Sequence, residues 1–270
     1  MKSIFTNKIK FFGAFLLISG ITFSQTGAET AADKRVQAGL TTNIGMNLLS
    51  LGTTRMESNG LGGNFSIGIV LHGTFKSSKN LGIATGLDFD FATQKYATKV
   101  PTYYRYVDTD ILPKEDSGTG SSLFSLTERS QKSTYISVPL MLLFRTEFIG
   151  DFRYFGKFGI RNSFLVASKF NDYGSVVGGS TDLIENNNMK SPGEAFLYQG
   201  SVGLSAGAEW NFVGTTCLVL EGGYYYGVTP QYLDRKDNKK TLSTDNSLQQ
   251  VYYSNKSTMS QILFRVSLLF

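Results

Sequence analysis

The last eleven residues of the chain, SQILFRVSLLF, alternate in polarity at the period of a β-strand. Counted back from the C-terminus, every second residue is apolar: Phe270, Leu268, Val266, Phe264 and Ile262. The opposite face carries a charge at Arg265. A strand with one unbroken apolar face and one polar face suits a wall between lipid and a polar lumen. The end of the chain therefore predicts a transmembrane β-strand.

The first 24 residues have the pattern of a secretory signal peptide. Three lysines precede an apolar run at 11–23, and Thr22 and Ser24 supply small residues for cleavage. The run is too short for a membrane-spanning helix. No cysteine lies nearby, which argues against a lipid anchor. We expect residues 1–24 to be a signal peptide and residues 25–35 to be a polar periplasmic lead-in.

Composition excludes several functional classes. The formal charge of +5 includes the three signal-segment lysines, so the remainder is near neutral and has no nucleic-acid footprint. A single cysteine, Cys217, excludes an intramolecular disulfide and a cysteine-based zinc cluster. We expect no metal or cofactor. His72 is the only histidine, which restricts acid–base catalysis. The G-x-S-x-G match at 203–207 could mark a nucleophile elbow, but it lies within a strand pattern rather than at a strand-to-helix turn. The sequence therefore argues against an enzyme.

Eight segments of the chain alternate like the last one. They lie near 36–48, 64–75, 81–91, 134–148, 153–166, 198–212, 218–228 and 260–270. Long connections alternate with short turns, as expected for an outer-membrane barrel with short periplasmic turns and long external loops. A soluble lipocalin-like barrel would need the reverse, with its polar face outward. The sequence predicts an all-β, eight-stranded antiparallel up-and-down transmembrane β-barrel over 36–270, with both termini periplasmic.

Charged residues recur on the predicted inward faces of these segments. The candidate lumen network is Asp88, Asp90, Arg145, Glu147, Lys157, Arg161, Glu209, Glu221 and Arg265, with Arg153 at the same parity. An eight-stranded barrel is only wide enough for its own side chains, and unpaired buried charges are costly. We therefore expect a salt-bridged plug. A path for protons or small ions along the same groups is the alternative.

The chain resembles the outer-membrane β-barrel family common in Bacteroidota, often described as porin-family or PorT-like. The resemblance is carried by YISVPL at 135–140, GKFGI at 156–160 and the terminal Phe270. The family pattern includes the proline, which accounts for Pro139, although a proline within a strand otherwise favours an edge or a bulge. The resemblance implies that the C-terminal strand is read by the barrel assembly machinery. The residues of this assembly signal would be Phe264, Val266, Leu268 and Phe270.

Four long connections are the predicted surface loops, and the three longest are 97–132, 167–196 and 229–256. Loops on a rigid barrel are where binding usually takes place. We expect an integral outer-membrane protein of a Gram-negative bacterium, in contact with outer-membrane lipid and lipopolysaccharide. Its predicted role is structural, interaction-based or secretion-related, through a protein partner at the extracellular loops. A small-conductance pore is the alternative, and a membrane-embedded enzyme using His72 ranks third.

Overall fold

The computed structural model describes residues 35–104, 123–178, 182–189, 195–213, 216–232 and 257–270. Contacts divide the chain into residues 1–30 and residues 31–270, and every described residue belongs to the second unit. The predicted signal peptide over 1–24 and nearly all of the lead-in over 25–35 lie outside these ranges. Within the ranges, no helix has the length and apolar character needed to cross a membrane.

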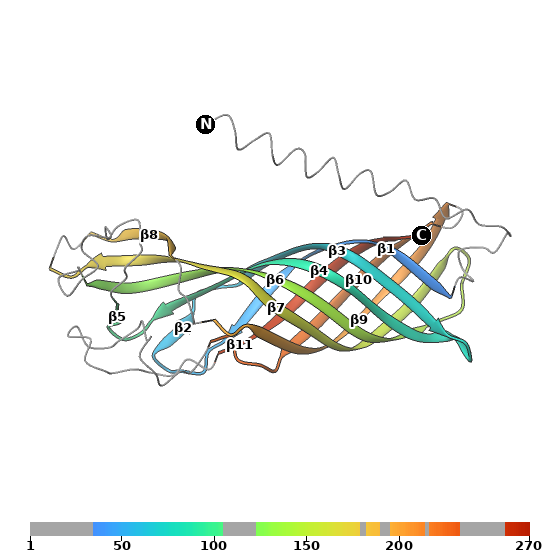
Figure 1. Cartoon of the computed structure of the whole chain (residues 1–270), viewed down its shortest axis with the longest axis horizontal. Helices are drawn as coiled ribbons and strands as arrows, with labels where there is room; N and C mark the ends of the chain where they lie inside the picture. Colours follow the sequence, from blue (N-terminus) through green and yellow to red (C-terminus); the bar gives the residue numbers. More distant parts are fainter. Residues whose placement is uncertain (1–34, 105–122, 179–181, 190–194, 214–215, 233–256) are drawn as a thin grey trace, which may run out of the picture. The chain divides into compact units, whose positions relative to one another are not determined.

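Eight long strands of the described chain form a closed antiparallel ring, as the sequence predicts. They are β1 (Val36–Ser50), β3 (Gly62–Phe75), β4 (Ser78–Thr98), β6 (Phe124–Arg145), β7 (Phe152–Val176), β9 (Tyr198–Val213), β10 (Thr216–Gly227) and β11 (Thr258–Leu269). Each pairs with the one before it, and β1 pairs with β11, where Thr42 lies opposite Val266. The strands are tilted around a common axis (Figure 1), as closure of a barrel requires.

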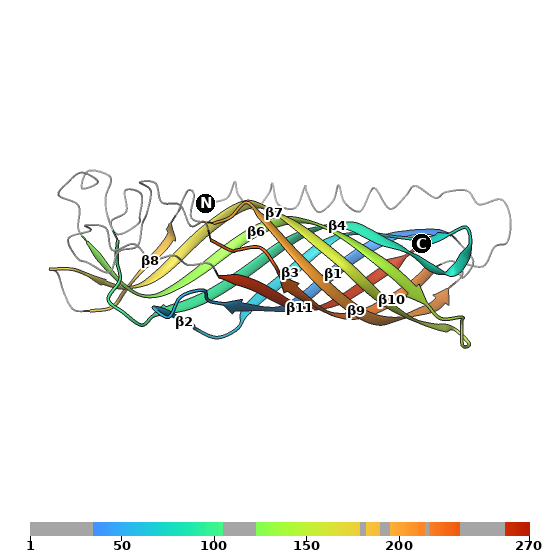
Figure 2. The same ribbon diagram turned by 90° about the horizontal axis from the view of Figure 1, so that it is seen from below.

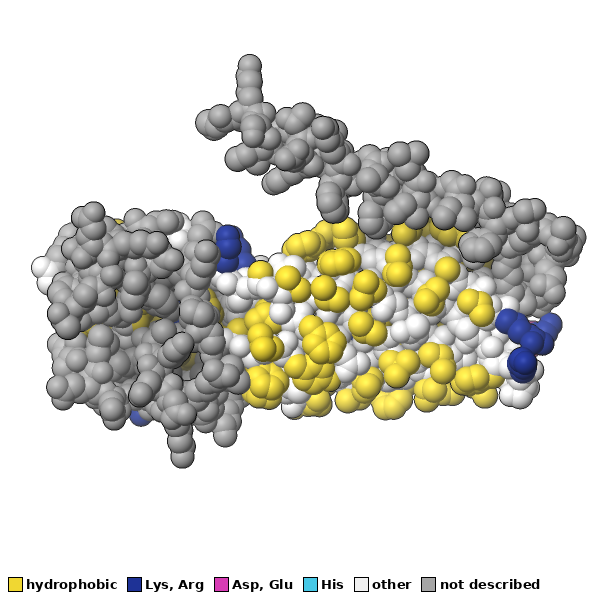
Figure 3. All heavy atoms as spheres, in the orientation of Figure 1, with side chains coloured by type: hydrophobic (Ala, Val, Ile, Leu, Met, Phe, Trp, Pro, Cys, Tyr) yellow, Lys and Arg dark blue, Asp and Glu magenta, His cyan; other side chains and the backbone are white. Residues whose placement is uncertain are grey.

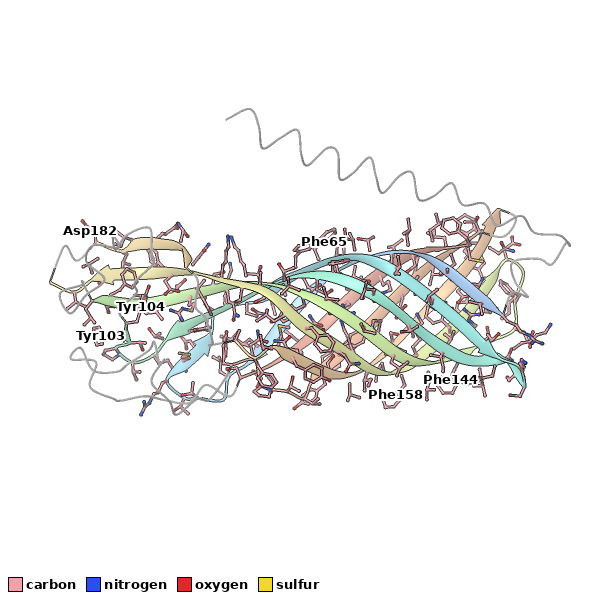
Figure 4. The ribbon with its side chains drawn as sticks, in the orientation of Figure 1. Phe65, Tyr103, Tyr104, Phe144, Phe158 and Asp182 are labelled. Carbon is pink, nitrogen blue, oxygen red and sulfur yellow. The ribbon has the colours of Figure 1, made fainter. Side chains whose placement is uncertain are left out.

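The outer surface of the ring is a hydrophobic band, which Figure 3 shows on one face. Alternation places apolar side chains outward, so Ile44 is 62% exposed and Leu204 is 61% exposed. Phe65, Phe144 and Phe158 point away from the barrel axis (Figure 4). Large apolar side chains exposed in this number need a lipid environment. The ring is therefore a transmembrane barrel.

Pro139 lies in the interior of a ring strand, β6, and not at an edge or a bulge. It pairs with Arg161 of β7, while the β4–β6 ladder is interrupted between the pairs Thr85–Leu140 and Asp88–Ser137. Proline has no N–H to give to that ladder. The Thr85 hydroxyl instead donates to the Pro139 carbonyl at 2.8 Å. The proline is thus accommodated by a local gap in one ladder.

Three of the ring strands continue beyond the hydrophobic band into a second sheet region (Figure 2). We call this region the sheet extension. It consists of 93–98 of β4, 124–132 of β6 and 168–176 of β7, together with the short strands β2 (Met56–Ser58), β5 (Tyr103–Tyr104) and β8 (Ile184–Met189). The assignment of 124–132 and 167–176 to loops is therefore wrong. Likewise, Ser78 to Asn80 begin β4 and do not belong to a turn.

The barrel and the sheet extension have separate clusters of buried apolar residues. The barrel cluster includes Leu143, Phe155, Val219 and Tyr225. The sheet extension has its own cluster of Met56, Tyr96, Tyr104, Phe124, Leu126, Phe170 and Tyr232. In the extension the outward side chains of β4, β6 and β7 are mostly polar and the apolar cluster faces inward, so the polarity of the outer face is the reverse of that of the ring. This reversal is the pattern of a sheet in water.

Candidate functional site in the barrel lumen

The inward face of the ring contains buried charges at nearly every level. Eight of the nine charges predicted for the lumen are buried, as is Arg153. Glu147 is the exception, and its placement in the lumen is wrong. Because β6 ends at Arg145, the strand alternation does not extend to Glu147, which is exposed in the connection to β7. The described lumen therefore contains four carboxylates and five basic side chains.

Glu209 of β9 is the centre of the cluster nearest the short turns. One of its carboxylate oxygens lies 3.1 Å from Arg145 of β6, and the other accepts hydrogen bonds from Arg153 of β7. Arg145 also donates to Nδ1 of His72 at 2.9 Å, and the guanidinium of Arg153 lies over the ring of Phe148. His72 is thus held inside an ion-paired cluster as a hydrogen-bond acceptor.

The next level contains an ion pair between Lys157 of β7 and Glu221 of β10, at 2.7 Å. The Ser205 hydroxyl donates to the same carboxylate at 2.6 Å. Ser205 is the serine of the G-x-S-x-G match, and it lies in the middle of β9. A nucleophile elbow needs a strand-to-helix turn, which this position does not provide. Ser205 therefore acts here as a structural donor.

The glycines beside Ser205 make room for aromatic rings in the lumen. A Cβ added at Gly203 would lie 2.3 Å from the Tyr225 ring, and one at Gly207 would lie 2.6 Å from the Phe155 ring. These distances are shorter than van der Waals contact, and a Cβ at Gly207 would also lie 2.2 Å from the Leu220 carbonyl oxygen. A side chain at either position would therefore displace a ring, and at Gly207 also the backbone. The glycines keep the wall thin where the facing side chains are large.

Asp88 and Asp90 of β4 share the guanidinium of Arg161. Arg161 contacts Asp90 at 2.7 Å and Asp88 at 3.1 Å. Arg265 of β11 binds Asp88 at 2.8 Å and Asn43 at 2.7 Å. Because two bases lie against the two carboxylates, the pair is part of the ion network and does not form an aspartic dyad that shares a proton.

Neutral polar side chains occupy the lumen toward the sheet extension. The Tyr135 hydroxyl accepts hydrogen bonds from Gln199 and Gln231, each at 3.0 Å. A cavity of about 10 Å³ lies beside them and is lined in part by Ser163 and Gln261. A space of this size holds about one water molecule. The side chains therefore leave little free volume at this level.

A buried ion pair in the sheet extension is absent from the sequence-based candidates. Arg129 of β6 donates two hydrogen bonds to Asp172 of β7, each at 2.7 Å, and both side chains are 0% exposed. The guanidinium lies 4.6 Å from the Phe170 ring centre and 5.5 Å from that of Tyr104. Both charged residues lie in connections that the sequence predicts to be surface loops, 97–132 and 167–196. The signal that could have found them is the inward alternation at 129, 131, 133 and 135.

The predicted assembly-signal residues lie at the outer surface of the closing strand. Phe264, Val266 and Phe270 are 54%, 42% and 50% exposed, and Leu268 has the same parity. The backbone N–H of Phe270 donates to the carbonyl of Ala38 and extends the β1–β11 seam by one bond. Their role as an assembly signal stays a prediction. Within the described ranges, no three potential metal ligands gather at one place.

Several solved structures are similar to this chain. The attachment invasion locus protein Ail of Yersinia pestis is 12% identical, with 88% of this chain and 100% of that chain covered and a TM-score of 0.35. The outer membrane protein OprG of Pseudomonas aeruginosa is 10% identical, with coverages of 87% and 92% and a TM-score of 0.38. The outer membrane protease OmpT of Escherichia coli is 13% identical, with coverages of 90% and 97% and a TM-score of 0.33.

No curated protein sequence is significantly similar to this chain. The family model described as "Outer membrane protein beta-barrel domain" matches residues 23–232, which is most of the chain. The match agrees with the closed ring, the outward hydrophobic band and the polar lumen. It also indicates the outer membrane of a Gram-negative bacterium as the location. The chain belongs to the outer membrane protein β-barrel domain family.

Proposed function

We propose that this protein is a structural and interaction protein of the outer membrane, in which a plugged barrel anchors the sheet extension at the cell surface. The observation that carries this proposal is that ion pairs connect strands that are not neighbours in the ring. Arg265 of β11 binds Asp88 of β4, with β1 and β3 between them, and Lys157 of β7 binds Glu221 of β10 across β9. Such pairs reach past the strands between them and occupy the lumen.

The proposed orientation places the sheet extension outside and both termini in the periplasm. The N–H of Thr74, beside the β3–β4 turn, donates to the carbonyl of Arg35 at the start of the ring. The ends of the ring therefore lie with the short turns. A chain exported across the inner membrane enters its barrel from the periplasm, and short periplasmic turns are the rule in such barrels. The sheet extension then faces the medium.

The sheet extension is suited to presenting a fixed surface to a partner protein. Its own apolar cluster and the buried Arg129–Asp172 pair hold its strands together. An ordered surface loses less conformational entropy on binding than a flexible loop does. The PorT-like resemblance suggests that this partner protein is related to secretion. We propose no catalytic role, because Ser205 is engaged by Glu221 and His72 by Arg145.

Site-specific photocrosslinking in intact cells tests this proposal. A photoreactive side chain at Tyr173, which is 37% exposed on the extension, is compared with one at Tyr154, which is 52% exposed on the barrel. We expect a protein adduct of one reproducible mass from position 173 and none from position 154. Equal adducts from both positions, or none from 173, would contradict the interaction role.

The second candidate function is a small-conductance pore. It is favoured by the excess of one basic side chain in the described lumen and by the cavity beside Gln199. In this function, ions would pass by exchange along the charged side chains. Neutralising Arg161 would then change the conductance. Planar bilayer recordings distinguish the two functions.

A further inference from the structure

Three lysines point outward where the hydrophobic band meets the sheet extension. They are Lys95 of β4, Lys132 of β6 and Lys169 of β7, and all three are exposed. Each is adjacent in sequence to an almost fully buried residue, so its own side chain faces away from the interior. Figure 3 shows basic side chains at the ends of the hydrophobic band. We call these three residues the lysine cluster.

The register of the sheet brings the three lysines together. Lys132 and Lys169 are directly opposite each other in the β6–β7 ladder, which places their Cβ atoms about 4.5–5.5 Å apart. Lys95 lies opposite Ser130 and is therefore diagonal to Lys132, with a Cβ separation of about 7–8 Å. Like charges directly opposite each other destabilise a sheet. This arrangement therefore calls for a compensating anion.

A β-bulge creates the direct lysine pair. The β6–β7 register shifts between Thr134, which faces Ala167, and Tyr135, which faces Leu165. Without the extra residue, Lys169 would be opposite Gln131, whose side chain is buried inside the barrel. The bulge thus turns Lys169 from the inward face to the outward face.

One carboxylate lies near the lysine cluster within the described strands, on the side of Lys95. Lys95 is opposite Ser130, so Glu128 of β6 is diagonal to Lys95, but Glu128 is four residues from Lys132, or about 13 Å along a strand. The outward neighbours of Lys132 in the two adjacent strands are Thr93 and Lys169. By contrast, Lys99, directly after β4, is 3.3 Å from Glu57. The directly opposed pair Lys132–Lys169 is therefore the part of the cluster that no neighbouring carboxylate balances.

The depth of the cluster matches the headgroup layer of a membrane. Along β4, the outward residue Phe91 is 48% exposed in the hydrophobic band, and Lys95 is two outward positions beyond it. Along β7, Val166 is 60% exposed in the hydrophobic band and lies three residues before Lys169. Lysine stems lie along apolar surface while the ammonium group reaches the polar layer. The three ammonium groups therefore lie where phosphates of a lipid headgroup would be.

We propose that the lysine cluster binds the phosphorylated headgroup of an outer-leaflet lipid. Lysine is a common point-charge ligand for phosphate, and basic clusters at the membrane surface bind anionic headgroups. The proposal names a ligand class for the exposed side of the barrel and rests on the proposed orientation. Each lysine is expected to strengthen binding about fivefold, so the loss of two weakens it about 25-fold.

Lipid A titrations of the folded mature chain in neutral detergent test this binding. The variant Lys132→Gln with Lys169→Gln is compared with Lys76→Gln with Lys99→Gln, which removes the same charge from exposed positions outside the cluster. We expect the first variant to raise the Kd for diphosphorylated lipid A about 25-fold and the second to leave it unchanged. Dephosphorylated lipid A should bind both variants and the natural chain equally.

Several outcomes would overturn the proposal. Equal weakening by the two variants would assign the effect to net charge, and no weakening by the first would remove the cluster's role. Displacement of lipid A by millimolar inorganic phosphate would indicate a site for free anions. The variant Ser130→Cys, labelled in intact cells with an impermeant maleimide, tests the orientation separately, since the natural Cys217 is buried. Failure of labelling alongside normal lipid A binding would reject the orientation and, with it, the outer-leaflet ligand.

Discussion

Replacing Glu209 by Gln removes the carboxylate that two buried arginines share. Arg145 and Arg153 would keep their charges with side chains only 1% and 6% exposed. Removing one partner of a buried ion pair costs about 3–5 kcal/mol, because the remaining charge is left uncompensated. Since the slight exposure of Arg153 admits some water, we expect the lower value, about 3 kcal/mol of unfolding free energy. That loss changes the unfolding equilibrium about 150-fold.

Urea unfolding in phospholipid vesicles measures this change. Trp210 is the only tryptophan and is 42% exposed on the outer surface, so its fluorescence reports insertion into lipid, and circular dichroism follows the strands independently. Glu57→Gln is the matched control. Its partner Lys99 lies at 3.3 Å with both side chains about half exposed, and such pairs contribute under about 1 kcal/mol. If Glu209→Gln lowers the unfolding free energy no more than Glu57→Gln does, the conclusion that the lumen is desolvated is refuted.

Three further predictions concern other parts of the molecule. Arg129→Met leaves the buried carboxylate of Asp172 unpaired and should loosen the sheet extension. Limited proteolysis should then cut the extension faster, while the heat-modifiable gel mobility of the barrel persists. Cleavage no faster than in the natural chain would contradict this. Gly207→Val forces the Phe155 ring out of the lumen and should lower stability by about 1–3 kcal/mol, whereas Gly156→Ala, with space for its Cβ, should not. Phe270→Ser should refold normally in detergent but reach the outer membrane in smaller amounts; normal amounts would remove its signal role.

The ring could be predicted from sequence because lipid on one side and the polar lumen on the other enforce the alternation of apolar and polar residues. Lipid outside and charge pairing inside require opposite polarity at successive residues, as at Phe264 and Arg265 in β11. The parity therefore predicts which side chains turn inward, and eight of the nine candidate lumen charges are buried. It failed at Glu147, because parity has meaning only while a strand continues, and β6 ends at Arg145.

The sheet extension could not be predicted, because its alternation has the opposite sign. In β6 the outward residues change from Leu140, Leu142 and Phe144 in the ring to Ser130 and Lys132 in the extension, where Phe124 and Leu126 face inward. A search for outward apolar faces therefore finds the strands only within the membrane and misses their continuation into the sheet extension. The ion-pair partner of each charge could not be predicted either, because pairs such as Arg129–Asp172 and Arg265–Asp88 depend on the register between strands.

Single-channel recording of the refolded mature chain in a planar bilayer tests the central claim, that ion pairs plug the lumen. Heat-modifiable gel mobility first establishes that the barrel is folded. We expect no conductance steps from the natural chain, because Glu209, Glu221, Asp88 and Asp90 hold their bases in ion pairs inside the lumen. Stable steps of defined size that change with Glu209→Gln would contradict it and identify the lumen as an ion path.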